Sequence, residues 1–225
     1  ARLGNPDTLF VTIPEVKKAT CFGTSTGSAR VAGNGGTQPY TYFWAVTSPA
    51  QRDSLITGLQ AGTYRVSVTD ARNCPAVQEV KLGQPDPVKS NFTVEGVRCH
   101  GGKDGTVALR ASGGTAPYTY LWQDGSSGER ILGQPAGRVA VTITDANKCT
   151  TLAVAEVGQP EKPLSGTTEK QDAVCFGAEN GKIIVLATGG TPPYRYSLNN
   201  GDLNGSSLQF GLGAGTYRPQ IVDVN

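Results

Sequence analysis

The chain has 225 residues, among them 30 glycines and 14 prolines but no methionine. Glycine and proline disfavour helices, and no segment shows a sustained helical apolar period, so the sequence predicts an all-β protein. Charged residues make up 17% of the chain, the formal net charge is +2, and there is no basic run. This excludes the phosphate-neutralising surface of a nucleic-acid-binding protein. No apolar run approaches the roughly 20 residues that a membrane-spanning helix needs.

The first 82 residues predict six short strands, in chain order at residues 9–13, 28–31, 40–44, 54–57, 64–69 and 77–82. The fifth of these alternates apolar and polar side chains, as a strand with one buried face does. Short strands separated by turns favour a two-sheet antiparallel sandwich. The dipeptides Asp104-Gly105 and Asn180-Gly181, in later parts of the chain, predict hairpin turns.

One motif, Gly-Gly-Thr-x-Pro-Tyr-x-Tyr, occurs three times, at residues 35–42, 113–120 and 189–196. Cysteines 21, 99 and 175 and aspartates 70, 145 and 223 share the same period of about 76 residues. Because this length suits a self-contained domain, we expect three immunoglobulin-like sandwich modules arranged as beads on a string. Their predicted bounds are 1–82, 83–157 and 158–225, with the third module truncated at its C-terminal end.

The segments that open the modules, Gly4-Asn5-Pro6, Gly83-Gln84-Pro85 and Gly158-Gln159-Pro160, are predicted to be linkers stiffened by proline. The segment Leu59 to Tyr64 resembles the tyrosine corner of immunoglobulin-like sandwiches, and Leu212 to Tyr217 repeats it. In the second module, Leu132 to Val139 is expected to be two residues longer and to carry valine in place of the tyrosine.

Trp44 and Trp122 take the same place in the third strand, where the third module has Leu198. We interpret them as core residues, and the alternative is an exposed platform on which a sugar stacks.

The five cysteines follow the repeat. Cys21 and Cys74 bracket the first module and Cys99 and Cys149 the second, which predicts the disulfides Cys21–Cys74 and Cys99–Cys149. Cys175 is then unpaired, because the partner expected four residues after Asp223 falls beyond the chain. Disulfides of this kind imply an oxidising compartment outside the cytoplasm. Zinc is the rival interpretation, but a Cys-x-x-Cys pair is missing and there is one histidine.

No catalytic residue, cofactor site or metal site is predicted. His100 stands alone beside Cys99 and is interpreted as a packing or surface residue. Calcium needs six to eight oxygen ligands, and each module offers too few clustered acids. Asp70, Asp145 and Asp223 are therefore interpreted as the start of Asx-type turns that lead to a cysteine.

The combined pattern resembles the SprB-type repeat of Bacteroidota gliding-motility adhesins. It joins Cys21-Phe22-Gly23, the Gly-Gly-Thr motif with Trp44, the Leu59 to Tyr64 corner, and Asp70-Ala71 before Cys74. The resemblance implies a protein exported by type IX secretion and displayed on the outer surface, attached to the outer membrane without inserting into it. It also implies O-glycans on Asp-Ser/Thr-apolar triplets, for which Thr8 and Ser54 are candidates.

Three functions remain open at this stage. The first is an adhesin repeat that attaches to a surface or polysaccharide during gliding. The second is a spacer that only extends a distal adhesive tip and contacts neighbouring repeats, and the third is an accessory module of a secreted enzyme. An exposed aromatic cluster repeated in every module would favour attachment, and its absence would favour the spacer.

Overall fold

The computed structural model describes residues 7–45 and 51–225. The opening segment Gly4-Asn5-Pro6 lies outside the described residues. Within them the regular structure is β-strand throughout. The strands are β1 (Phe10–Lys17), β2 (Gly27–Asn34), β3 (Thr41–Trp44), β4 (Leu55–Leu59), β5 (Gly62–Thr69), β6 (Pro75–Leu82), β7 (Lys89–Glu95), β8 (Gly105–Ser112), β9 (Thr119–Trp122), β10 (Arg130–Gln134), β11 (Gly137–Thr144), β12 (Thr150–Val157), β13 (Ser165–Gln171), β14 (Gly181–Thr188), β15 (Arg195–Leu198), β16 (Leu208–Leu212) and β17 (Pro219–Val222).

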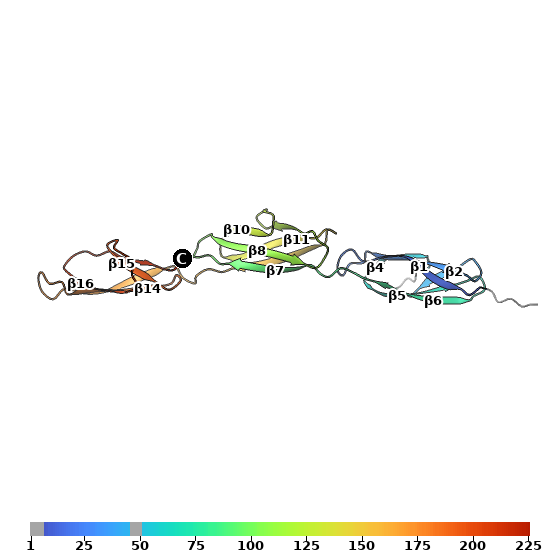
Figure 1. Cartoon of the computed structure of the whole chain (residues 1–225), viewed down its shortest axis with the longest axis horizontal. Helices are drawn as coiled ribbons and strands as arrows, with labels where there is room; N and C mark the ends of the chain where they lie inside the picture. The colour runs from blue at the N-terminus through green and yellow to red at the C-terminus, as the bar shows by residue number, and fades with distance from the viewer. Residues whose placement is uncertain (1–6, 46–50) are drawn as a thin grey trace, which may run out of the picture. The chain divides into compact units, whose positions relative to one another are not determined.

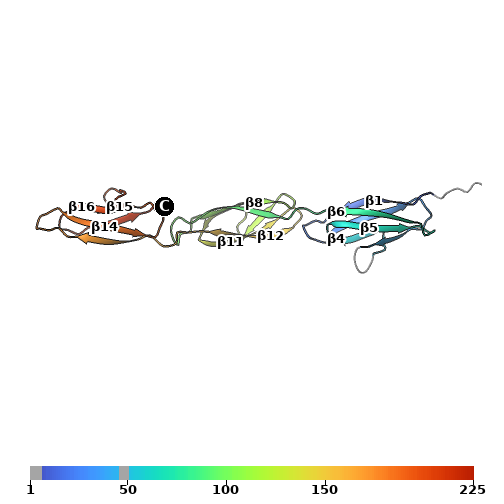
Figure 2. The same cartoon turned by 90° about the horizontal axis from the view of Figure 1, so that it is seen from below.

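Strands β1 to β6 are called repeat 1, β7 to β12 repeat 2 and β13 to β17 repeat 3. Repeat 1 is built from two antiparallel three-stranded sheets, ordered β1-β2-β4 and β3-β5-β6 (Figures 1 and 2). In chain order these strands correspond to A, B and E on one sheet and C, F and G on the other. That division is the one found in immunoglobulin-like sandwiches. The predicted fold class is thus confirmed, and each of the six predicted strands overlaps an observed one.

The core of repeat 1 lies between these two sheets. Trp44 on β3 is fully buried, and its indole N–H donates to the carbonyl oxygen of Asp53 at 2.9 Å. Around it pack buried aliphatic side chains from both sheets: Ala29, Val31, Ile56, Leu59, Val66, Val68, Val80 and Leu82. Satisfying the one polar atom of a buried tryptophan makes its burial favourable. The interpretation of this residue as core is confirmed.

Repeats 2 and 3 use the same strand order. Repeat 2 has sheets β7-β8-β10 and β9-β11-β12, and repeat 3 has sheets β13-β14-β16 and β15-β17. Trp122 of repeat 2 is also buried and donates through Nε1 to the carbonyl oxygen of Gly128 at 2.9 Å. In repeat 3, β17 pairs with β15 alone among the described strands, whereas β5 and β11 lie between two neighbours.

The tyrosine corner is present where it was predicted. The Tyr64 hydroxyl donates to the carbonyl oxygen of Gln60 at 2.8 Å, and the Tyr217 hydroxyl donates to that of Gly213 at 3.0 Å. The prediction of a longer corner in repeat 2 is wrong. Gln134 pairs with Gly105 in the register in which Leu59 pairs with Gly27, so Gln134, and not Leu132, takes the place of that leucine.

The predicted hairpin turns at Asp104-Gly105 and Asn180-Gly181 are also wrong. Strand β7 ends at Glu95 and β8 begins at Gly105, so a nine-residue loop connects them and the glycine starts a strand. The side chains of Asp104 and Asn180 instead accept backbone N–H groups of Arg98 and Val174 inside these loops. The first residue of each dipeptide therefore stabilises a long loop through a hydrogen bond from the loop backbone to its side chain.

The chain divides into two compact parts whose boundary passes through repeat 2. The first consists of residues 1–90, 111–119 and 143–151, and the second of residues 91–110, 120–142 and 152–225. Each junction between repeats lies inside one part, the first junction in the first part and the second junction in the second. The module bounds given from the sequence stay a prediction. No helix among the described residues is long and apolar enough to span a lipid bilayer.

Candidate functional site at the junctions between repeats

The three recurring aspartates are structural anchors. Asp70, Asp145 and Asp223 are buried, and their Oδ2 atoms accept the backbone N–H of Thr37, Thr115 and Thr191 at 2.9–3.0 Å. Their Oδ1 atoms accept the N–H two residues ahead. Oδ1 of Asp70 and Asp145 also accepts the N–H of the following cysteine at 2.9 Å. Each carboxylate thus ties the turn that begins at the aspartate to the Gly-Gly-Thr loop, as the Asx-turn interpretation predicted, and in repeats 1 and 2 this turn leads to the second cysteine.

These hydrogen bonds also act on the charge of the group. The backbone N–H of Cys74, followed by those of Thr37 and Arg72, lowers the pKa of Asp70 because each N–H stabilises the carboxylate form; partial desolvation opposes them. A carboxylate whose oxygens are already occupied by three backbone donors is a poor calcium ligand. The described residues contain no cluster of three His, Cys, Asp or Glu side chains able to hold a metal ion.

The disulfide joins two different repeats. Cys21 of repeat 1 is bonded to Cys149 of repeat 2, with their Cα atoms 5.7 Å apart, while Cys74, Cys99 and Cys175 are free and exposed. The predicted pairs Cys21–Cys74 and Cys99–Cys149 are therefore wrong. The expected unpaired state of Cys175 stays a prediction.

Strand direction explains why the predicted pair within repeat 1 does not form. Cys21 lies beside Gly83, at the end of the sandwich where β5 begins, because Ala19 N–H donates to the Gly83 carbonyl oxygen at 3.0 Å. Cys74 lies in the turn after β5 ends. The eight residues of β5 separate the two ends by about 25 Å at roughly 3.3 Å per residue. Two cysteines can be bridged only when their Cα atoms lie within about 7 Å.

The linkers are held to the preceding repeat by hydrogen bonds. The Gln84 side-chain oxygen accepts the N–H of Gly23 at 2.7 Å, in the turn that carries Cys21. The amide nitrogen of Asn147 completes this junction by donating to the carbonyl oxygen of Thr20 at 3.1 Å and to the Thr115 hydroxyl at 3.0 Å. Side chains from repeat 2 and from the linker thus converge on residues 20–23 of repeat 1.

The second junction repeats this arrangement. The side-chain oxygen of Gln159 accepts the N–H of Gly101 at 2.8 Å, and the Gly158 carbonyl oxygen accepts the N–H of Val97 at 2.8 Å. Asn225 donates through Nδ2 to the carbonyl oxygen of Arg98 at 2.8 Å. His100 belongs to the same junction, with its Nδ1 2.9 Å from the Pro160 carbonyl oxygen. The lone histidine therefore contacts the linker rather than a partner suited to catalysis.

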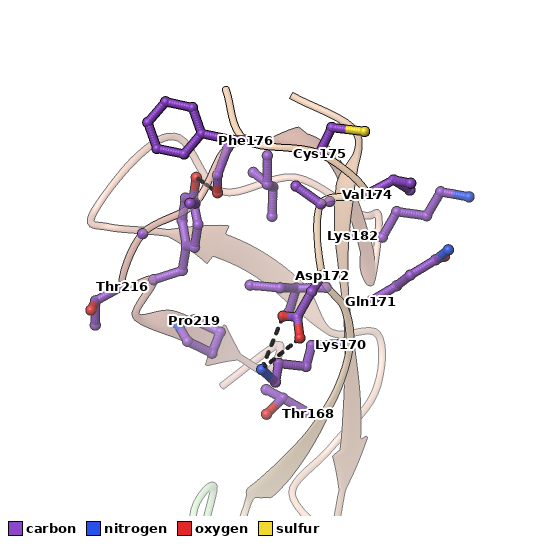
Figure 3. Close-up of a pocket in the computed structure, with 18 residues that line it drawn as sticks. Thr168, Lys170, Gln171, Asp172, Val174, Cys175, Phe176, Lys182, Thr216 and Pro219 are labelled. Atoms are coloured by element: carbon purple, nitrogen blue, oxygen red, sulfur yellow. Dashed lines mark hydrogen bonds and ion pairs between the residues drawn. The ribbon is translucent and has the colours of Figure 1, made fainter. Parts of the chain in front are cut away.

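The far end of repeat 3 carries an open groove of about 660 Å³. Figure 3 shows Cys175 and Phe176 at its rim and Lys170 paired with Asp172 inside it, with Nζ 2.9 Å from Oδ1. Gly181 at the start of β14 also lines the groove. At the equivalent place in repeats 1 and 2 the last strand covers the glycine. A Cβ on Gly27 would lie 2.5 Å from a Leu82 methyl, and one on Gly105 would lie 2.6 Å from a Val157 methyl.

The aromatic side chains that recur in all three repeats do not form an exposed surface. Tyr40, Tyr118 and Tyr194 each donate a hydroxyl hydrogen bond to the carbonyl oxygen of the first glycine of the Gly-Gly-Thr loop. The tyrosines two residues later are buried or half-buried. The exposed aromatic side chains of the described residues are phenylalanines at positions 10, 22, 43, 176 and 210. Phe22 and Phe176 lie at the junction position, which His100 occupies in repeat 2. At positions 10, 43 and 210 an exposed aromatic side chain does not recur in all three repeats.

The candidate glycosylation sites lie on the first repeat. Thr8 is exposed just before β1, and Ser54 is half-buried just before β4, where its carbonyl oxygen accepts the N–H of Val31. Modification at these two residues stays a prediction. Intact-mass measurement of the secreted protein would refute it by showing no added hexose.

The family model of the SprB repeat matches residues 14–45, 91–127 and 167–203, one segment in each of the three repeats. No curated protein matches the chain.

Solved structures with some likeness are arrays of immunoglobulin or fibronectin domains. One is described as Down Syndrome Cell Adhesion Molecule isoform 1.30.30, N-terminal eight Ig domains, at 16% identity and TM-score 0.29, covering 82% of this chain and 28% of that one. Another, on Dscam isoform specificity, has 14% identity and TM-score 0.28, covering 68% and 46%. Drosophila OTK extracellular domains 3–5 has 9% identity and TM-score 0.26, covering 95% and 93%. The chain spans less than half of the first two, and at these scores the fold rests on the strand order described above.

Proposed function

Because the chain carries three tandem SprB repeats, we propose that they form the stalk of a cell-surface adhesin, a structural spacer that holds an adhesive region away from the cell. SprB repeats indicate a cell-surface protein of the gliding-motility adhesin type and a module without catalysis. The finer steps are part of the proposal: display outside the outer membrane, export by type IX secretion, and a spacing rather than a gripping role.

One observation carries the choice of the spacer. The side chains that recur from repeat to repeat either stabilise the sandwich itself or contribute to the contact with the next repeat. The recurring tyrosines close turns, and the recurring Gly-Gln-Pro linkers place Gln84 and Gln159 on the turn after the first cysteine. A repeated binding surface would instead present the same exposed side chains in every copy. Aromatic residues, which stack on sugar rings, do not recur in this way outside the junction.

The rival function is attachment by the repeats themselves. Its best support is the set of exposed phenylalanines, among which Phe210 is 74% exposed on β16. Its counterparts in the strand register are Thr57 and Leu132, so the side chain is particular to repeat 3. A single-copy patch of this kind suits a local contact better than a repeated adhesive surface.

Binding of the oxidised chain to a glycan array, to bare glass and to polystyrene tests the proposal. We expect no saturable binding up to high micromolar concentration. A matched pair of variants identifies the source of any binding: Phe210→Ser removes the exposed aromatic, and Leu152→Ser removes a similarly exposed aliphatic side chain on β12 (70%). Saturable binding that Phe210→Ser abolishes and Leu152→Ser preserves would overturn the spacer and make the repeats the adhesive element.

A further inference from the structure

The bonded and free cysteines follow one rule when they are numbered by their place in the repeat. Each complete repeat has a first cysteine after its first strand and a second cysteine in the turn before its last strand. The observed bond joins the first cysteine of repeat 1, Cys21, to the second cysteine of repeat 2, Cys149. The three free thiols, Cys74, Cys99 and Cys175, are those whose counterparts under this rule would belong to an adjoining repeat.

Cys74 has the same local setting as the bonded Cys149. The residues before them, Asn73 and Lys148, both have positive φ, 63° and 67°. Both cysteine N–H groups donate to Oδ1 of the buried aspartate at 2.9 Å. Cys74 is therefore held in a turn like the one that holds Cys149 in its bond, with its thiol exposed at the end of repeat 1 opposite Cys21.

An independent contact places the second junction in the same register as the first. Asn147 donates to the carbonyl oxygen of Thr20, the residue before Cys21, and Asn225 donates to the carbonyl oxygen of Arg98, the residue before Cys99. Both contacts join residues 127 positions apart. Two residues after Asn147 the chain reaches the cysteine bonded to Cys21. The chain two residues after Asn225 would reach Cys99 in the same way.

The groove of repeat 3 is the place for the strand that would carry this cysteine. The last strand of repeats 1 and 2 begins just after the second cysteine and covers the glycine of the second strand with a leucine or valine methyl. In repeat 3 the matching Gly181 lines the groove, and β17 pairs on one side only among the described strands. A strand alongside β17 would fill the groove and start beside Cys99.

We propose that every junction between consecutive repeats is closed by a disulfide from the first cysteine of one repeat to the second cysteine of the next. A cysteine placed two residues after Asn225, at the start of a strand of the β12 type, would then bond Cys99, and that strand would occupy the groove of repeat 3. Cys74 and Cys175 would bond cysteines of an adjoining repeat by the same rule. In each bond two thiols lose two protons and two electrons as the S–S bond forms. A disulfide oxidant, such as oxidised glutathione, accepts them and leaves as two thiols. The inference does not depend on whether the repeats space or grip.

A grafted tail tests the second junction directly. The chain is lengthened after Asn225 by a copy of residues 148–157, which places a cysteine at position 227 and adds the β12 sequence. The control carries the same tail with serine in place of that cysteine. After oxidation in a glutathione buffer and alkylation of free thiols, disulfide-linked tryptic peptides are identified by mass spectrometry. Each native cysteine falls in its own tryptic peptide, with Cys99 in 99–103 and Cys175 in 171–182.

The expected result is a tail peptide linked to residues 99–103 and alkylated Cys175. A tail linked to residues 171–182, or alkylated in the folded protein, would overturn the rule. The serine control gives a second readout. Compared with the chain that lacks the tail, a docked tail should slow hydrogen exchange of the β17 amides by roughly tenfold or more. Unchanged exchange there would overturn the assignment of the groove to this strand. Neither outcome bears on ligand binding, which is measured separately.

Discussion

Breaking the bond between repeats should lower the stability of two repeats at once. The perturbation is Cys21→Ser together with Cys149→Ser, in a chain whose three free cysteines are replaced by serine to prevent exchange. The bond closes a loop of 128 residues, for which the chain-entropy model gives about 5 kcal/mol at 25 °C. The loop encloses β2 to β11, so the loss should fall on repeats 1 and 2 and leave repeat 3 unchanged.

The two tryptophans make the loss measurable repeat by repeat. Trp44 and Trp122 are the chain's only tryptophans and are buried in different repeats, so fluorescence in guanidinium chloride follows each one when the other is replaced by phenylalanine. Shared between two small modules, about 5 kcal/mol corresponds to midpoints lower by ~1 M. Reductant should lower the midpoints of the parent to those of the variant. Midpoints that agree within ~0.2 M, in a parent whose bond is verified by peptide mapping, would refute the reasoning.

Three further predictions concern single side chains. Trp122→Ala should lower the unfolding free energy of repeat 2 by about 3–5 kcal/mol, because it leaves a cavity. A loss of unfolding free energy below about 1 kcal/mol, measured by thermal melting, would contradict its core role. The lowered pKa of Asp70 means that its contribution is present at neutral pH and is lost as the pH falls through the folded-state pKa, below the ordinary carboxyl value. Carboxyl NMR titration checks the direction, and Asp70→Asn should remove this part of the acid sensitivity. Gln84→Ala should cost about 1 kcal/mol and speed amide exchange at Gly23. Gln78→Ala, which removes a side-chain hydrogen bond to the neighbouring Glu79 carbonyl, should leave the exchange at Gly23 unchanged.

The strands and the core were predictable because their signal is local. Alternation in Tyr64 to Thr69 and the recurring motif around Trp44 required only neighbouring residues and the repeat period. Residue type alone matches Leu132 to Leu59, and this match misaligns the corner of repeat 2. The strand register shows that Gln134 takes that place and leaves Leu132 62% exposed.

The cysteine pairing failed for a different reason. The spacing of cysteines 21, 74, 99 and 149 fits bonds within repeats as well as bonds between them. Spacing alone therefore does not determine the pairing. Counting strand directions would have decided. Strand β1 ends where Cys21 lies, β5 runs to the opposite end, and Cys74 follows it, so the two cysteines of one repeat lie at opposite ends. The sequence does not reveal the Gln84 contact, because proline in the linker indicates only a stiff segment and not its hydrogen bond to Gly23.

The disulfide between repeats also changes what happens when the chain is pulled from its two ends. Tension would pass from Cys21 through the sulfur atoms to Cys149 and bypass the chain between them, a sequence separation of 128 residues. The bond would therefore prevent the extension of about 430 Å of backbone, at roughly 3.4 Å per residue. Strands β2 to β11 would carry no load, and only β1 and β12 of these two repeats could be peeled. Either repeat could lose its fold under a sudden pull without the molecule growing much longer.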